Sequence, residues 1–151
     1  MSRRRLAGLT LVPALAGVVG CGQPSPDLFA VERTGEGRGS DVSLVVSDAG
    51  TVTCNGGESR ALEAEQVLTA RELSRELTEA ATLSLELPPG RNPTLSYRVR
   101  LEAGIVSFTD ASRNRPASFD RLVGFTADVA ENVCGIERCA PPRRESLGAG
   151  G

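Results

Sequence analysis

Short stretches of alternating apolar and polar residues run through the chain between residues 28 and 109, separated by glycine, proline and asparagine. Alternation with a period of two is typical of strands that bury one face. In residues 94–102, the clearest stretch, the two sides carry Leu95, Tyr97, Val99 and Leu101 against Ser96, Arg98 and Arg100. The pattern predicts strands at residues 28–33, 41–47, 51–54, 94–102 and 105–109.

Two longer segments repeat their apolar residues at steps of three and four, which is typical of helices with one buried face. The first is residues 62–81, and its apolar positions are Val67, Ala70, Leu73, Leu77, Ala80 and Ala81. Thr69 and Glu72 have the spacing of a capping box, so the regular helix begins near residue 62 or at Thr69. The second is residues 116–134, and its apolar positions are Phe119, Leu122, Val123, Val129, Ala130 and Val133.

The elements follow one another in the order βββαββα. Each helix offers a single apolar stripe, which suits packing on one face of a sheet. The sequence therefore predicts an α+β fold, with an antiparallel sheet of four to five strands and two helices packed on one face.

The first 20 residues have the layout of a secretory signal, with Arg3–Arg5 ahead of an apolar run from Leu6 to Val19. A bilayer core takes about 20 residues to cross, so this run is too short to span it. The run ends in Val18-Val19-Gly20-Cys21, which resembles the lipobox of bacterial lipoproteins. The resemblance implies cleavage before Cys21, acylation of its thiol and attachment to the extracytoplasmic face of the cell membrane. An ordinary signal peptide with an incidental cysteine is the alternative.

This layout divides the chain into four parts. We expect a signal peptide at 1–20, a lipidated cysteine with a proline-rich tether at 21–27, one α+β domain at 28–137, and a disordered tail at 138–151. We expect the domain to be a monomer.

The chain contains no histidine, and all 17 of its basic residues are arginine. A Ser-His-Asp triad, a Cys-His pair and a His-ligated zinc site are therefore excluded. Without lysine, Walker-type phosphate binding and Schiff-base catalysis are excluded as well. Once Arg3–Arg5 are removed, 14 arginines face 19 acidic residues, and a net charge of −5 argues against a nucleic-acid partner. Arginine in place of lysine is typical of a high-GC genome such as that of an actinobacterium.

Three cysteines remain if Cys21 is lipidated: Cys54, Cys134 and Cys139. An extracytoplasmic location favours disulfides, and three thiols allow one bond. Cys54 ends a predicted strand and Cys134 ends a predicted helix, so we expect Cys54–Cys134, with Cys54–Cys139 as the alternative. The spacing C-x₄-C differs from the C-x-x-C of thiol oxidoreductases. We expect no metal site and no cofactor.

Residues 34–40, Thr-Gly-Glu-Gly-Arg-Gly-Ser, form a glycine-rich connection between two predicted strands. Gly35, Gly37 and Gly39 give the spacing G-x-G-x-G, but a strand follows rather than a helix. A dinucleotide-binding fingerprint needs the helix, so we interpret this segment as a surface loop. Asp110, Asp120 and Asp128 form no recognisable acid–base pair.

The loop also takes part in a resemblance. Arg33, Thr34 and Gly35 at the end of a strand, followed by glycines, and later Leu95, Tyr97, Val99 and Leu101 in an aromatic-containing strand, are similar to motifs of emfourin-like proteins. Those proteins are small α+β inhibitors of thermolysin-type metalloproteases. The resemblance implies that Arg33, Thr34, Gly35, Gly37 and Gly39 belong to a loop that enters a protease cleft.

The residues and the resemblance together predict a membrane-anchored, non-enzymatic module that binds an extracytoplasmic protein or peptide, with a protease as one form of partner. Two alternatives are an envelope enzyme that uses carboxylates on glycans, and a carrier of a small ligand. The carrier needs a cavity, for which a two-layer domain of this size seldom has room.

Overall fold

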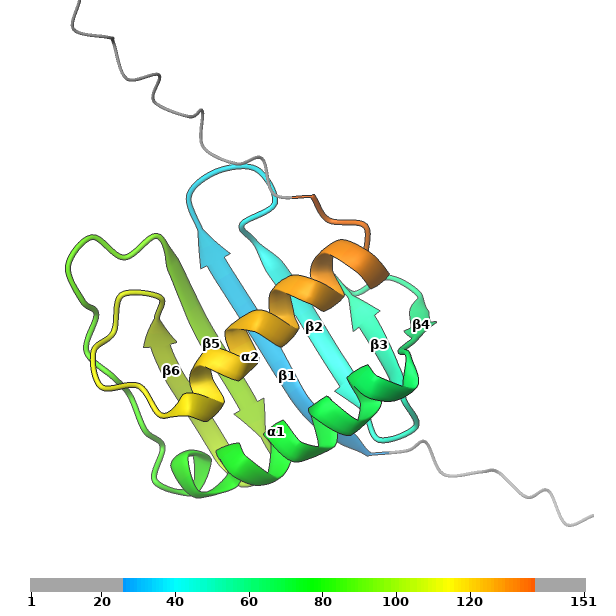
Figure 1. The fold of residues 1–151 in the computed structure, drawn as a ribbon, viewed down its shortest axis with the longest axis horizontal. Helices are drawn as coiled ribbons and strands as arrows, with labels where there is room; N and C mark the ends of the chain where they lie inside the picture. Colours follow the sequence, from blue (N-terminus) through cyan, green and yellow to red (C-terminus); the bar gives the residue numbers. More distant parts are fainter. Residues whose placement is uncertain (1–25, 138–151) are drawn as a thin grey trace, which may run out of the picture.

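The computed structural model describes residues 26–137 and contains one antiparallel sheet of six strands in the order β4-β3-β2-β1-β5-β6. Figure 1 shows both helices lying over the same face of this sheet. The elements are β1 (Asp27–Gly35), β2 (Val42–Ser47), β3 (Thr51–Cys54), β4 (Ser59–Ala61), α1 (Ala64–Thr82), β5 (Leu95–Leu101), β6 (Gly104–Thr109), α2 (Ala117–Asp128) and the π-helix η1 (Val129–Val133). The predicted α+β class is confirmed. Cys21, Cys139, the predicted signal peptide and the predicted tail lie outside the described residues.

The expected count of four to five strands is wrong, because β4 extends the sheet beyond β3. All three residues of β4 are exposed, so the strand has no apolar side that a pattern could reveal. Its position is set by pairing with β3, in which Arg60 lies opposite Val52.

β1 lies at the centre of the sheet, between β2 and β5. Phe29, Val31 and Arg33 point to the helix side and are buried, while Glu32 and Thr34 are exposed on the opposite face. β5 has the same alternation, as predicted, with four buried and three exposed residues. The sheet therefore has one apolar face under the helices and one polar face turned to solvent.

α1 begins at Ala64, and its capping box consists of Glu63 and Gln66. The alternative start at Thr69 is wrong, since Thr69 lies inside the helix. Glu72 faces the neighbouring helix instead of capping α1: Arg121 of α2 donates to Glu72 at 2.8 Å and to Glu76 at 2.6 Å.

The second predicted helix changes type before it ends. The α-helical part stops at Asp128, and residues 129–133 continue as η1, with Gly135 at φ +68° just beyond. This segment brings Cys134 to Cys54, and the two form a disulfide with a Cα–Cα distance of 5.9 Å. The predicted pairing is confirmed.

The outer edge of β6 is covered by the connection from α1 to β5. Ser107 donates its backbone N–H to Leu85 and accepts from Leu87. Closer to the strand end, Ser112 and Arg115 contact the backbone of Thr109. These contacts occupy the groups that an open edge strand would otherwise offer to another chain.

Among the described residues, no helix has both the length and the apolar character that crossing a membrane requires.

Candidate functional site

The glycine loop (residues 34–40) connects β1 to β2 and lies at the end of β1 opposite to Asp27 (Figure 1). A strand of nine residues spans about 30 Å, at ~3.3 Å per residue. The loop is therefore held roughly 30 Å from the point at which the chain enters the sheet.

The side chain of Arg33 binds the backbone of this loop from the buried face of the sheet. Its side chain is only 1% exposed, although it is charged. Nε donates a hydrogen bond to the carbonyl oxygen of Ser40 at 2.9 Å, and Nη2 donates one to that of Gly39 at 2.8 Å. Tyr97 lies directly opposite Arg33 on β5 and stacks on Phe108, with 5.1 Å between ring centroids. A buried guanidinium thus rests against packed strands and fixes the far side of the loop.

Further hydrogen bonds close the loop from within. Ser40 donates from Oγ to the carbonyl oxygen of Glu36 at 2.6 Å, and Asp41 accepts from the backbone N–H of Gly35 at 3.1 Å. Each bond crosses the base of the loop rather than its tip. The tip, around Gly37 and Arg38, is left exposed.

Two of the glycines are required by the backbone. Gly37 and Gly39 have φ of +99° and +74°, a region that residues with a Cβ rarely adopt. Gly35 is needed for a different reason, since a Cβ there would lie 2.4 Å from the carbonyl oxygen of Thr94. The spacing read in the sequence therefore reflects the shape of a hairpin loop and its close contact with the next connection.

The predicted site residues fall into two groups. Thr34, Gly35 and Gly37 are exposed, and Gly39 is half-buried, so these belong to the accessible loop. Arg33 is buried, so it positions the loop and does not itself reach a partner.

Two other connections leave the sheet at the same end. They are the proline loop (residues 83–94), before β5, and the Asp110 turn (residues 110–116), after β6. Ser112 donates to the carbonyl oxygen of Pro88 at 2.9 Å, and Gly90 lies so close to Ala111 that a Cβ would clash with its carbonyl. The three connections form one interlocked surface, because the glycine loop contacts the proline loop through Gly35 and Thr94.

Asp110 holds the two later connections together. It accepts from the backbone N–H of Thr94 at 3.0 Å and also from the Thr94 hydroxyl. Partial burial by itself raises the pKa of Asp110, but the hydrogen bonds from Thr94, Leu95 and Ala111 together outweigh it and lower the pKa below its ordinary value. The carboxylate of Asp110 thus acts as a hydrogen-bond acceptor that joins the two connections.

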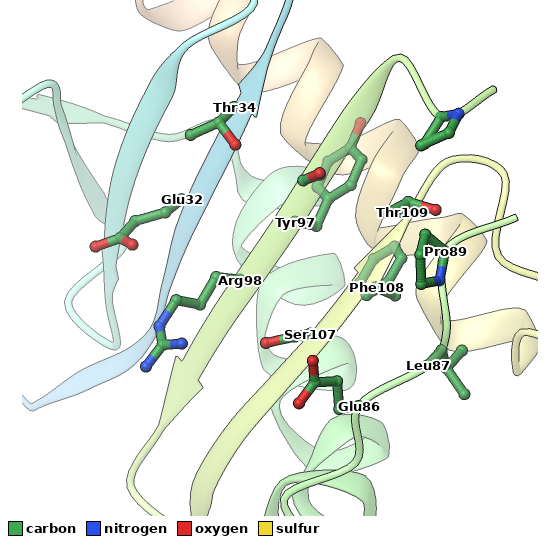
Figure 2. Close-up of a pocket in the computed structure, with 12 residues that line it drawn as sticks. Glu32, Thr34, Glu86, Leu87, Pro89, Tyr97, Arg98, Ser107, Phe108 and Thr109 are labelled. Carbon is green, nitrogen blue, oxygen red and sulfur yellow. The ribbon is translucent and has the colours of Figure 1, made fainter.

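A shallow groove of about 500 Å³ lies on the uncovered face of the sheet, beside the base of the glycine loop (Figure 2). Its floor comes from β1, β5 and β6, where the exposed Glu32 and Arg98 and the half-buried Ser107 lie in one row across the strands. Figure 2 shows Leu87 and Pro89 of the proline loop along the β6 side. Glu86 is the second carboxylate that lines the groove.

In the part of the chain from residue 26 to residue 137, no group of three or more His, Cys, Asp or Glu residues is arranged to hold a metal ion.

Sequence reasoning missed the proline loop and the Asp110 turn as parts of this surface. Their local signal is present, since Pro88-Pro89-Gly90 and Asn92-Pro93 mark turns. What places them beside the glycine loop is strand order, because β5 pairs with β1 across an intervening helix. A hydrophobic pattern does not encode that pairing.

No family model, no curated protein and no solved structure matches this chain.

Proposed function

We propose that this protein is a lipid-anchored, extracytoplasmic module that carries out no reaction and binds another protein through the glycine loop. The observation that carries the proposal is the support of an exposed loop by the buried side chain of Arg33. Binding costs less when a contact loop is already ordered, because less conformational freedom is lost in the complex. A loop held in this way is suited to docking.

The position of the loop supports the same proposal. If Cys21 carries the lipid, the membrane lies near Asp27, at the opposite end of β1 from the loop. The loop would then face away from the bilayer, toward other extracytoplasmic proteins. The specific form we propose is inhibition of a protease, on the resemblance of Arg33, Thr34 and Gly35 to emfourin-like inhibitors of thermolysin-type enzymes.

Lipidation is tested at Cys21. We expect the wild-type protein to incorporate radiolabelled palmitate in a bacterial host and to sediment with membranes. The Cys21→Ala variant should incorporate no label, because only the thiol accepts the acyl group. Cys139→Ala is the control, since it removes a cysteine without touching the lipobox. Equal labelling of Cys21→Ala and wild type would contradict the proposal.

Loop-dependent inhibition is tested with thermolysin. The full-length protein, purified in detergent, should slow cleavage of a peptide substrate, and a Gly37→Ala/Gly39→Ala variant should inhibit at least tenfold less well. Both substitutions force a Cβ into a left-handed backbone, at a cost of about 1 kcal/mol each, and so distort the tip. The control is Gly50→Ala, which imposes the same strain (φ +79°) in the β2–β3 turn at the other end of the sheet.

If the wild-type protein does not inhibit thermolysin, the proposal that it is a protease inhibitor is overturned. The broader proposal is then tested by a photo-crosslinking residue at Glu36 in intact cells, compared with one at Glu79 on α1. A protein adduct that forms at Glu36 and not at Glu79 supports binding through the loop. Adducts of equal yield at both positions would count against it.

A further inference from the structure

Three exposed arginines occupy the three connections at the loop end of the sheet. Arg38 lies in the glycine loop, Arg91 in the proline loop and Arg113 in the Asp110 turn. Within residues 26–137, none of the three makes an ion pair or a side-chain hydrogen bond. Arg115 on the same turn differs from them, because it is bound to Asp120 at 2.6 Å.

The antiparallel order of the strands brings these arginines to one end. Gly35 at the end of β1 pairs with Leu95 at the start of β5, and Ser96 pairs with Thr109 at the end of β6. The three connections must therefore leave the sheet side by side. The contacts described above, through Thr94, Gly90 and Ser112, then fix the loops against one another.

Each of the three arginines precedes a residue in the left-handed conformation. Gly39 has φ +74°, Asn92 has φ +52° and Asn114 has φ +56°. Glycine and asparagine are the residues that adopt this conformation at low cost, and it turns the chain sharply. The same local arrangement, a cation at a tight turn, thus occurs in three loops that are unrelated in sequence position.

The acidic groups near the three arginines are largely bound to the loops themselves. Asp41 accepts from the backbone of Gly35, and Asp110 accepts from Thr94. Two exposed acids have no such role: Glu36 on the glycine loop, and Glu86, which lies farther along the proline loop beside Ser107 of β6. The groups most free to meet a partner at this end are therefore predominantly guanidinium groups.

These cations contrast with the rest of the domain. Residues 26–137 contain 18 acidic residues against 11 arginines, a formal charge of −7. At the opposite end, where the chain enters, Asp27 and Glu102 lie near Arg100, and Asp48 pairs with Arg71 at 2.9 Å. The three connections contain four arginines and three acidic residues, so this end of an otherwise acidic domain repels a negatively charged partner least.

We infer that the partner of the glycine loop is a protein with a carboxylate-rich surface, and that Arg38, Arg91 and Arg113 contact it around the loop. The inference rests on the proposed function, since it takes the loop as the docking element. Arginine suits this role because its planar guanidinium donates two parallel hydrogen bonds to one carboxylate.

The test uses the full-length protein in detergent and fluorescein-labelled poly-L-glutamate as the probe, with binding read by anisotropy. The loop variant is R38Q/R91Q/R113Q. The matched control is R71Q/R75Q/R100Q, which removes three exposed arginines that lie outside the three connections and outside the groove. Both variants lose the same charge, so only the position of the arginines differs.

We expect the loop variant to bind poly-L-glutamate about tenfold more weakly than wild type, the control to change it less than about threefold, and added salt to weaken wild-type binding. Equal loss in both variants would overturn the inference, since net charge alone would then explain the binding. Failure of wild type to bind the probe at low ionic strength would overturn it too. Tighter binding of inorganic polyphosphate through the same arginines would replace the protein partner with a phosphate polymer.

The thermolysin experiment separates this inference from the proposed function. Loop-dependent inhibition that is unchanged in R38Q/R91Q/R113Q would leave the proposed function in place and overturn the acidic partner. Loss of inhibition in that variant but not in R71Q/R75Q/R100Q would support both.

Discussion

Removal of the Cys54–Cys134 disulfide will lower the free energy of unfolding by about 4.5 kcal/mol, the figure that loop-closure entropy gives for a bond across 80 residues. The bond ties the end of β3 to the residue after η1, and so links the second strand hairpin to the second helix. A side-chain hydrogen bond lies beside it, in which Arg60 donates to the carbonyl oxygen of Val133 at 2.6 Å. Without the disulfide, this exposed hydrogen bond and the partly buried side chains of Val133 and Ile136 are left to hold the end of η1.

The measurement is urea unfolding of the full-length protein, comparing wild type with Cys54→Ala/Cys134→Ala. The Cys139→Ala variant is the control, because it removes a cysteine that the structure does not pair with Cys54. It should unfold at the wild-type urea concentration. Wild-type stability in the double variant, or a mapped Cys54–Cys139 bond, would contradict the pairing.

Replacement of Arg33 by methionine will lower the free energy of unfolding by about 2–3 kcal/mol and will release the glycine loop. Methionine fills much of the same space, so the cost arises mainly from the carbonyl groups of Gly39 and Ser40, which lose their donors. An unsatisfied buried polar group costs about 1–3 kcal/mol. Ser40 is itself 5% exposed, so water cannot easily replace the guanidinium there.

Hydrogen exchange distinguishes loss of the loop from general destabilisation. In Arg33→Met, amide exchange should accelerate in the glycine loop well beyond its acceleration in β5. Arg38→Met is the control in the same loop: it is exposed, so its effect on stability should stay within about 0.5 kcal/mol. Unchanged exchange in the loop of Arg33→Met would show that the side chain does not hold it.

Strands and helices that bury one face could be predicted from the sequence. An element without a buried face could not, because it leaves no hydrophobic pattern. The alternation in β5 placed all four buried residues correctly, because a period of two with apolar side chains on one side fits only a half-buried strand. β4 has no buried residue and is defined only by its partner. The sequence leaves the start of α1 open between residue 62 and Thr69, and the structure places it at Ala64, because Glu63 and Gln66 form the capping box.

Prediction of the candidate site was limited by the same distinction between local and long-range information. The glycine loop was found because its composition is local. The burial of Arg33 was not foreseen, because an arginine in an alternating strand is ordinarily assigned to the polar face. Yet Arg33 follows Phe29 and Val31 at intervals of two, so the alternation along β1 places its side chain on the buried face. The adjoining loops required the pairing of β1 with β5, which no short segment specifies.

That pairing also determines how the chain folds. Val31 lies opposite Val99, 68 positions later, so the centre of the sheet joins residues that are far apart in the chain. Hairpins such as β2–β3 and β5–β6 can form within microseconds, but contacts of high sequence separation form slowly. Until β5 pairs with β1, the core that buries Phe29 and Val31 is incomplete. The domain is therefore expected to remain unfolded until nearly all of its residues are available, and then to fold as one cooperative unit.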